Sequence, residues 1–347
     1  MPLKLNKISL LLVLLSISAV FFFIEDLFLC SVHIPFSNVI DILFTSSSEK
    51  LSWNIIVLES RLPRALTAIL CGAALSISGL QMQTLFRNPL AGPYILGISS
   101  GAGLGVAIFI MGLGFLGISL THLTWIGNYG IIISSIIGSS CVLFILLVSI
   151  IRLKDIMTVL ILGIMIGSVA SALISIIQYF SYDNSLKSFV MWMMGDLSNV
   201  SLAQLKILFP VVLLGLILSF LISKKLNTYL LGEDYAQSLG VNIKMTQFTI
   251  IIITAILAGS ITAYCGPIGF VGIVVPHLAR LISKSSNHII IIPLSVLIGT
   301  NMLLISDIIS QLPGSEKVIP INAITSLIGI PFIFWIIFKN KRISELN

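Results

Sequence analysis

Long apolar runs separated by short polar segments dominate this chain. They give ten candidate membrane spans, at roughly 8–28, 62–83, 93–114, 127–151, 156–180, 202–222, 246–265, 268–283, 288–309 and 319–338. Most of the runs approach the ~20 residues that a helix needs to cross a bilayer. Inside lipid the backbone must pair its own polar groups, and the short alternating segments of a barrel are missing. We therefore predict an all-α polytopic membrane protein, with residues 1–347 forming a single transmembrane domain.

The polar segment 224–244 interrupts this pattern between two of the long apolar runs. Within it, Gly232 and Gly240 bracket a short stretch, from Glu233 to Leu239, that could be a helix. Helices below ~12 residues are marginal in water, so this one would need support from the adjoining spans or from a partner. The segment is either a contact surface for a partner or an ordinary loop.

Composition excludes a soluble domain and indicates the orientation of the spans. The chain is 57% hydrophobic and only 9% charged, so most of its formal charge of +6 reflects topology. If the amino terminus is cytoplasmic, that side holds most of the basic residues: Lys4, Lys7, Arg87, Arg152, Lys154, Lys224, Lys225, Lys244, Arg280, Lys284, Lys339, Lys341 and Arg342. The run from Ile8 to Ile24 lacks an A-x-A cleavage pattern and is interpreted as a retained first span. Both termini and segment 224–244 are expected to be cytoplasmic.

Two arginines depart from this charge bias. Arg61 and Arg64 lie at the outer mouth of the second span, where Pro63 suits a first helical turn and is expected to mark the start of the helix. Their guanidinium groups could reach lipid headgroups or pair with carboxylates on an external partner. The residues alone leave both alternatives open.

Small residues are concentrated between Gly72 and Gly105, where they would let helices approach closely in lipid. Gln81, Gln83 and Asn88 lie among them, and amides at that depth usually face protein or water, which favours the wall of a pathway over exposure to lipid.

Ion coupling and catalysis find little support in the sequence. No acidic residue occurs between Glu59 and Asp155, although ion-coupled carriers commonly place carboxylates in their spans; Asp307 is the main exception. The four cysteines show no C-x-x-C spacing or clustering with histidine, so we expect inert buried thiols and no metal site. His277, beside a helix break, is more often structural than a ligand. No G-x-x-x-x-G-K-[ST] loop is present, so any nucleotide is expected on a partner.

Several motifs occur in one order along the chain. They are Arg61-Leu-Pro-Arg64, Gln83-x-x-x-Arg87-Asn-Pro-Leu-Ala91, Leu96-Gly-Ile-Ser-Ser-Gly-Ala102, Trp192-Met-Met-Gly195, Gly232-Glu-Asp-x-Ala236-x-x-Leu-Gly240 and Gly266-Pro-Ile-Gly-Phe-Val-Gly272 followed by Pro276-His-x-x-Arg280. This ordered set, from about Arg61 to the carboxyl terminus, resembles the FecCD family of permease subunits of ABC importers. Each motif alone is weak, but their order and spacing are specific.

The resemblance implies the type II importer permease fold with ten helices, a homodimer with a path at its axis, two ATP-binding ATPase subunits and an extracytoplasmic substrate-binding protein. It implies no enzymatic activity, no cofactor bound by this chain and no nucleic-acid partner; membrane lipid is the remaining partner. By it, the residues that couple to the ATPase within the cytoplasmic segment 224–245 are Gly232, Glu233, Asp234, Ala236, Leu239 and Gly240. Arg61 and Arg64 resemble contacts for the binding protein, and Asn88 and Leu90 resemble the cytoplasmic gate of the path whose wall Gln81 and Gln83 are expected to form.

The chain departs from the family pattern near its end. Asp307 is followed by Gln311 and then by Val318-Ile319-Pro320, where the family commonly has an arginine and a Glu-Leu-Pro sequence. A third docking arginine is therefore missing.

The expected function is import of a ferric siderophore across the bacterial inner membrane, with haem or cobalamin as the alternative cargo. An ion-coupled secondary carrier and a membrane-embedded enzyme are the rival classes.

Overall fold

The computed structural model describes residues 2–29, 32, 34–45, 50–115, 124–153, 155–311 and 318–344. Within these ranges all regular secondary structure is helical, which confirms the predicted all-α class. In chain order the helices are α1 (Pro2–Phe28), α2 (Phe36–Thr45), α3 (Leu51–Ile55), the π-helix η1 (Ile56–Arg61), α4 (Leu62–Leu85), the 3-10 helix η2 (Pro93–Leu96), α5 (Ile98–Phe115), α6 (Thr124–Arg152), α7 (Ile156–Tyr179), α8 (Asp183–Met193), α9 (Leu202–Leu221), α10 (Ser223–Tyr229), α11 (Glu233–Ser238), α12 (Ile243–Cys265), α13 (Val271–Ser283), α14 (His288–Ser310) and α15 (Ile321–Ser344).

The membrane spans agree with the apolar runs. In the described ranges, seven helices are long and apolar enough to cross a membrane, and three shorter apolar helices, Ile98–Leu113, Val271–Ser283 and Ile321–Trp335, lie at the remaining predicted spans. The chain is therefore a multi-pass membrane protein. Two expected boundaries shift inward, because η2 precedes α5 and an extended stretch precedes α13.

Pro63 does not mark the start of the second span, as the sequence had suggested. Helical structure begins at Leu51 and runs without a break through η1 into α4. The π-helical turn comes just before Pro63, and the N–H of Leu62 donates to the carbonyl of Val57, five residues back. A proline has no N–H to give to the helix ladder, and a π turn is one way to accommodate that loss without ending the helix.

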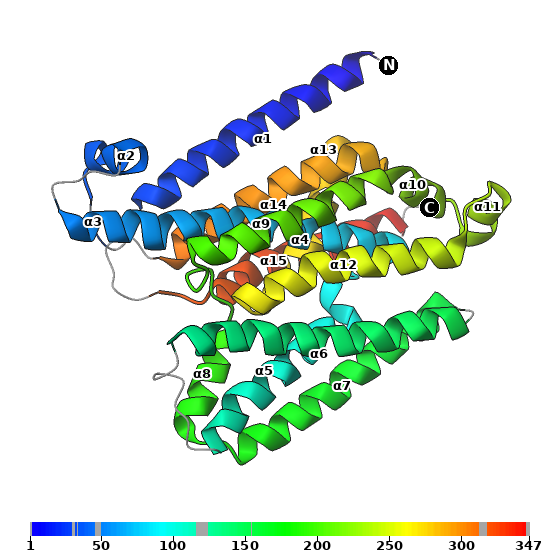
Figure 1. Ribbon diagram of the computed structural model, residues 1–347. Helices are drawn as coiled ribbons and strands as arrows, with labels where there is room; N and C mark the ends of the chain where they lie inside the picture. Colours follow the sequence, from blue (N-terminus) through cyan, green and yellow to red (C-terminus); the bar gives the residue numbers. More distant parts are fainter. Residues whose placement is uncertain are drawn as a thin grey trace.

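Helix α4 occupies the centre of one group of helices. In Figure 1 it lies among α1, α9, α12, α13 and α14, while α5, α6, α7 and α8 form a second group beside α12. Every residue of α4 from Leu70 to Leu85 is buried. It is therefore enclosed by protein, whereas α6 and α7 keep broad apolar faces exposed.

Glycines allow the close approach of α4 to two neighbours, as the run of small residues had predicted. A Cβ atom at Gly72 would lie 2.2 Å from the carbonyl oxygen of Gly299 in α14, and one at Gly79 would lie 1.8 Å from that of Gly272 in α13. In lipid, such backbone contact replaces the hydrophobic driving force as a source of helix association.

The two ends of the helix bundle differ. Figure 1 shows the amino-terminal end of α1, the carboxyl-terminal end of the chain and the short helices α10 and α11 at one end of the bundle. Helices α2 and α3 and the amino-terminal end of α4 lie at the other end, which is called the outer end because the distribution of basic residues predicts that it faces outward. The bundle therefore places the two termini and segment 224–244 on the same side.

Gly79→Ala should destabilise the protein, although alanine is favoured over glycine in a helix by about 1 kcal/mol. The added methyl group meets backbone of α13 that cannot move aside, and overpacking of this kind costs ~1–3 kcal/mol. Thermal unfolding in detergent measures the effect. Gly259→Ala in α12, where no atom lies within 4 Å of an added Cβ, is the matched control and should be neutral or stabilising. Equal melting temperatures for the two variants would contradict the packing described here.

Candidate functional site

Helix α11 is the projecting element that the sequence had singled out. It covers Glu233–Ser238 and is flanked by Gly232 and Gly240, whose φ angles of 120° and 82° favour glycine. Three apolar side chains, spaced four residues apart, face away from the protein: Leu231 is 63% exposed, Tyr235 56% and Leu239 58%. The predicted short helix is therefore confirmed, and it presents an apolar stripe.

A hydrogen-bonded cluster holds α11 to the neighbouring helices. The Tyr229 hydroxyl donates to Glu233 Oε1 at 2.5 Å, and Gln247 Nε2 of α12 donates to the same oxygen at 3.3 Å and to the Tyr229 hydroxyl oxygen at 3.2 Å. Burial raises the pKa of Tyr229, so its hydroxyl stays a neutral donor. Arg87 lies 5.5 Å from the centre of the Tyr229 ring. These contacts supply the support that so short a helix needs.

The predicted coupling residues divide into three groups. Glu233 and Ala236 face the protein, Glu233 through its hydrogen bonds and Ala236 with an exposure of 0%, and they position the helix. Leu239 and Asp234 face outward, and Gly232 and Gly240 form the turns. Leu231 and Tyr235 were not among the predicted residues, although Tyr235 precedes Leu239 by four residues, a helical spacing that could have found it.

A cleft of about 430 Å³ lies beside α11, between it, the α6–α7 corner and the start of α12. Asp155, Asp234 and Gln237 line it together with Lys244, whose amino group donates to the Ile151 carbonyl at 3.0 Å. The cleft shows that the α6–α7 corner approaches α11.

The two arginines at the other end of the bundle are bonded within the chain. Arg61 is 4% exposed and donates to the backbone carbonyls of Leu27, at 2.9 Å, and of Val32. Arg64 forms a bidentate ion pair with Asp307 of α14. Its Nη2 lies 2.7 Å from Oδ1, and its Nε lies 2.9 Å from Oδ2. Both guanidinium groups therefore have internal partners, and contact with an external protein stays a prediction for both.

Gln311, which stands where the family pattern has an arginine, takes part in the same cluster. Its amide nitrogen donates to Asp307 Oδ2 and to Asp26 Oδ1, each at 3.0 Å. Asp26 belongs to α1 and Asp307 to α14, so Gln311 joins these helices at the outer end. This residue is a structural link here.

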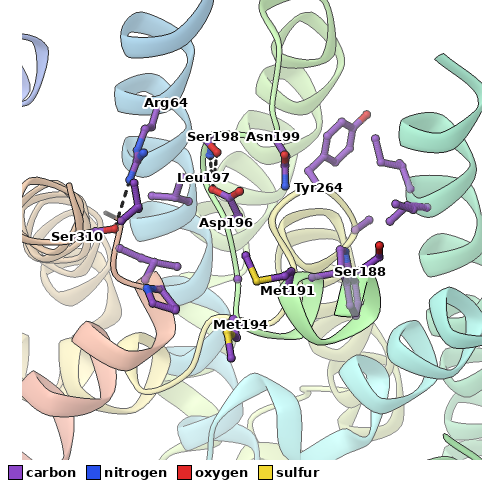
Figure 2. Close-up of a pocket in the computed structure, with 18 of the residues that line it drawn as sticks. Arg64, Ser188, Met191, Met194, Asp196, Leu197, Ser198, Asn199, Tyr264 and Ser310 are labelled. Carbon is purple, nitrogen blue, oxygen red and sulfur yellow. Dashed lines mark hydrogen bonds between the residues drawn. The ribbon is translucent and has the colours of Figure 1, made fainter. Parts of the chain in front are cut away.

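An outer cavity of about 440 Å³ opens next to this cluster. Figure 2 shows Arg64 and Ser310 on one side of it and Tyr264 on the other, with Asp196, Ser198 and Asn199 between them. The sequence did not predict this cavity, because its lining comes from five separate stretches of the chain. Its remaining lining residues include Ser188, Met191, Met194, Leu197, Gln204 and Ile321.

A second cavity, of about 540 Å³, lies on the opposite face of α8. Serine and amide side chains from α7 and α15 line it: Ser171, Ser175, Gln178, Asn322 and Ser326. Phe189, Val190 and Met193 of α8, with the adjoining Met194, complete its wall, and none of its lining residues is ionisable. These wall residues were also missed, because hydroxyl groups within an apolar helix give little sequence signal.

The predicted path residues Gln81 and Gln83 face protein, as expected of amides at that depth. Gln81 is 0% exposed; its Nε2 donates to Ser219 of α9 at 2.9 Å, and its Oε1 accepts from Thr254 of α12 at 3.0 Å. Gln83 accepts from Arg280 at 2.5 Å and donates to the Ile273 carbonyl at 3.0 Å. Neither residue lines the cavities described above.

The predicted gate residues Asn88 and Leu90 lie in the exposed turn after α4. Asn88 Oδ1 accepts from the backbone N–H of Leu90 at 2.9 Å, and Leu90 is 40% exposed. They lie at the same end of α4 as the α10–α11 region, because Arg87 beside them reaches Tyr229.

Comparison with known proteins gives consistent results. A family model described as the FecCD transport family matches residues 13–339. The hemin transport system permease protein HmuU of Yersinia pestis is 35% identical over 303 residues, covering 86% of this chain and 88% of that protein. The vitamin B12 import system permease protein BtuC of Klebsiella pneumoniae is 35% identical over 284 residues, covering 82% of each. A solved structure of a metal-chelate type ABC transporter, in an inward-facing conformation, superposes with a TM-score of 0.80 at 28% identity, covering 96% of this chain and 99% of that one.

Asp307→Ala should destabilise the protein by ~3–5 kcal/mol, because it leaves the buried Arg64 guanidinium without its carboxylate. The double variant Arg64→Met with Asp307→Leu removes both charges and should recover most of that loss. Thermal unfolding in detergent compares the two. A loss below about 1 kcal/mol for Asp307→Ala, typical of an exposed pair, would mean that Arg64 is held elsewhere and is available to a partner.

Proposed function

Because this chain belongs to the FecCD transport family and is a permease of an ABC importer, we propose that it carries a ferric siderophore across the bacterial inner membrane. Two copies would form the permease, with the path between them, and two ATPase subunits would bind and hydrolyse ATP on the cytoplasmic side. A substrate-binding protein would deliver the cargo from outside. The chain itself would be no enzyme and bind no cofactor.

The apolar stripe of α11 carries the proposal of an ATPase partner. Leu231, Tyr235 and Leu239 are each more than half exposed at an end of the bundle that is rich in basic residues, where positive charge indicates the cytoplasm. Exposed apolar side chains that project from a membrane domain into water are typical of a protein contact. Both chain termini lie at this end, in agreement with a cytoplasmic location.

Helix α12 supplies a route from that contact to the outer cavity. It starts three residues after Gly240 and ends at Cys265, whose neighbours Ala263 and Tyr264 line the cavity. The Gln247–Glu233 hydrogen bond joins α11 to α12 directly. Closure of the ATPase pair would move α11, and rigid spans would transmit that movement toward the outer end.

The cavity beside α8 supports a metal chelate as the cargo. Its hydroxyl, amide, thioether and aromatic side chains offer contacts to a large organic ligand and include no ionisable group that would bind a bare ion. A ferric siderophore fits this description, and haem and cobalamin are the alternatives. Gln81, Gln83, Asn88 and Leu90 would act around the path and at its cytoplasmic end.

Arg64 and Arg61 would take different parts in docking of the binding protein. Arg64 borders the outer cavity and would meet an acidic partner residue at its exposed edge while still paired to Asp307. Arg61 is enclosed and would shape the outer surface through its carbonyl contacts.

An ion-coupled secondary carrier is the rival function. The described spans hold few carboxylates, and Asp307 is paired with Arg64. Uptake that survives deletion of the ATPase gene and stops when the ion gradient is collapsed would favour this rival.

Leu239→Asp should lower nucleotide-dependent uptake by about tenfold or more, because loss of a central apolar contact typically costs ~2 kcal/mol of binding. Leu239 is exposed, so the protein should still fold. The measurement is uptake into vesicles containing the permease and its ATPase. Phe36→Asp, a similarly exposed apolar position in α2 at the outer end, is the control and should keep uptake. Wild-type uptake by Leu239→Asp would refute the proposed contact.

Uptake of labelled ferric siderophore, haem and cobalamin by a strain that lacks this subunit tests the cargo. We expect loss of ferric siderophore uptake alone, restored by the plasmid-borne gene. Selective loss of haem or cobalamin uptake would overturn the siderophore assignment and leave the importer assignment standing.

A further inference from the structure

Two cysteines meet inside the protein although 194 residues separate them in sequence. Cys71 lies in α4 and Cys265 is the last residue of α12; their exposures are 0% and 2%. The two Sγ atoms are 3.5 Å apart, and both thiols are free. This contact was not predicted, since the spacing of the cysteines along the chain suggested inert buried thiols.

The pair lies directly behind the wall of the outer cavity. Ala263 and Tyr264, immediately before Cys265, line the cavity, and the Cys265 carbonyl accepts a hydrogen bond of 2.8 Å from the N–H of Asp196, another lining residue. Arg64, two helical turns from Cys71 along α4, borders the same cavity. The cavity wall therefore lies one residue from Cys265, whose thiol contacts that of Cys71.

We propose that Cys71 and Cys265 are a redox-closable pair, whose disulfide ties α4 to α12 at the outer cavity. Each thiol loses one hydrogen, an Sγ–Sγ bond forms, and a two-electron thiol oxidant accepts the two electrons and two protons. A disulfide bond is ~2.05 Å long, so the sulfur atoms need to approach by only ~1.5 Å. The outer side of a bacterial inner membrane is an oxidising compartment, which favours the bond.

A disulfide between Cys71 and Cys265 would hinder movement of α12, the helix that connects α11 with the outer cavity. This consequence rests on the proposed function. Helix α12 connects α11 with the outer cavity, and α4 is the enclosed helix of the bundle. A covalent tie between them would prevent α12 from shifting against α4. The oxidised permease should therefore lose most of its nucleotide-dependent uptake.

The experiment uses the full chain with Cys30→Ser and Cys141→Ser, so that only the proposed pair remains. Cys141 is exposed on α6, and Cys30 lies outside the described residues. The purified protein in detergent is treated with diamide, whose N=N bond is reduced to a hydrazine as the disulfide forms. The sample is then denatured and alkylated with N-ethylmaleimide. Its intact mass is measured by mass spectrometry, and its peptides are mapped.

After diamide treatment we expect neither thiol to be alkylated and a peptide linked through Cys71 and Cys265 to appear. Reduction with dithiothreitol should restore alkylation of both thiols. Adding Cys71→Ser or Cys265→Ser should abolish the linked peptide and leave one alkylated thiol. Two fully alkylated thiols after native oxidation, with a disulfide formed when the same chain is oxidised unfolded, would overturn the proposal. So would a diamide-derived mixed adduct on one thiol in place of the link.

Uptake by the oxidised and reduced forms, with the Cys71→Ser variant as control, separates the two parts of the inference. A linked protein with unchanged uptake would keep the disulfide and overturn the arrest of α12. Absence of uptake in the reduced form as well would count against the proposed function and leave the mass measurement standing.

Discussion

Backbone contact between α4 and its neighbours is the constraint on which the rest of the structure depends. In a bilayer, helices gain little from hiding apolar side chains from one another, since lipid is equally apolar. Gly72 and Gly79 let α4 touch the backbone of α14 and α13 directly. With α4 fixed in this way, Arg64 lies against Asp307 at one end and Arg87 against Tyr229 at the other.

Polar contacts then define the two ends of the bundle. At the outer end the Arg64–Asp307–Gln311–Asp26 cluster joins α1, α4 and α14 in a setting where an unpaired charge would be costly. At the inner end the Tyr229–Glu233–Gln247 cluster turns α11 so that Ala236 faces the protein and Leu239 faces outward. In both clusters, buried polar side chains bond to one another and so fix the positions of the helices that carry them.

Sequence reasoning predicted what depends on local chemistry. The length of the apolar runs predicted the spans, the run of small residues predicted close packing, and the two glycines predicted a short helix at 233–239, observed as Glu233–Ser238. It failed where local and tertiary preferences differ: Pro63 favours a helix start, but the continuous helix from Leu51 accommodates it with a π turn. It also could not find sites assembled from distant segments, such as the cavities on either side of α8 and the Cys71–Cys265 contact.

The central claim is that the exposed stripe of α11 seats the ATPase subunit. Its most direct measurement is photo-crosslinking from a benzoylphenylalanine at position 235 in membranes that contain the complete importer, with the same probe at the exposed Tyr182 as control. The account predicts a crosslink from position 235 to the ATPase subunit, identified by mass spectrometry, and none from position 182. A crosslink from position 235 to the substrate-binding protein, or to lipid alone, would contradict it.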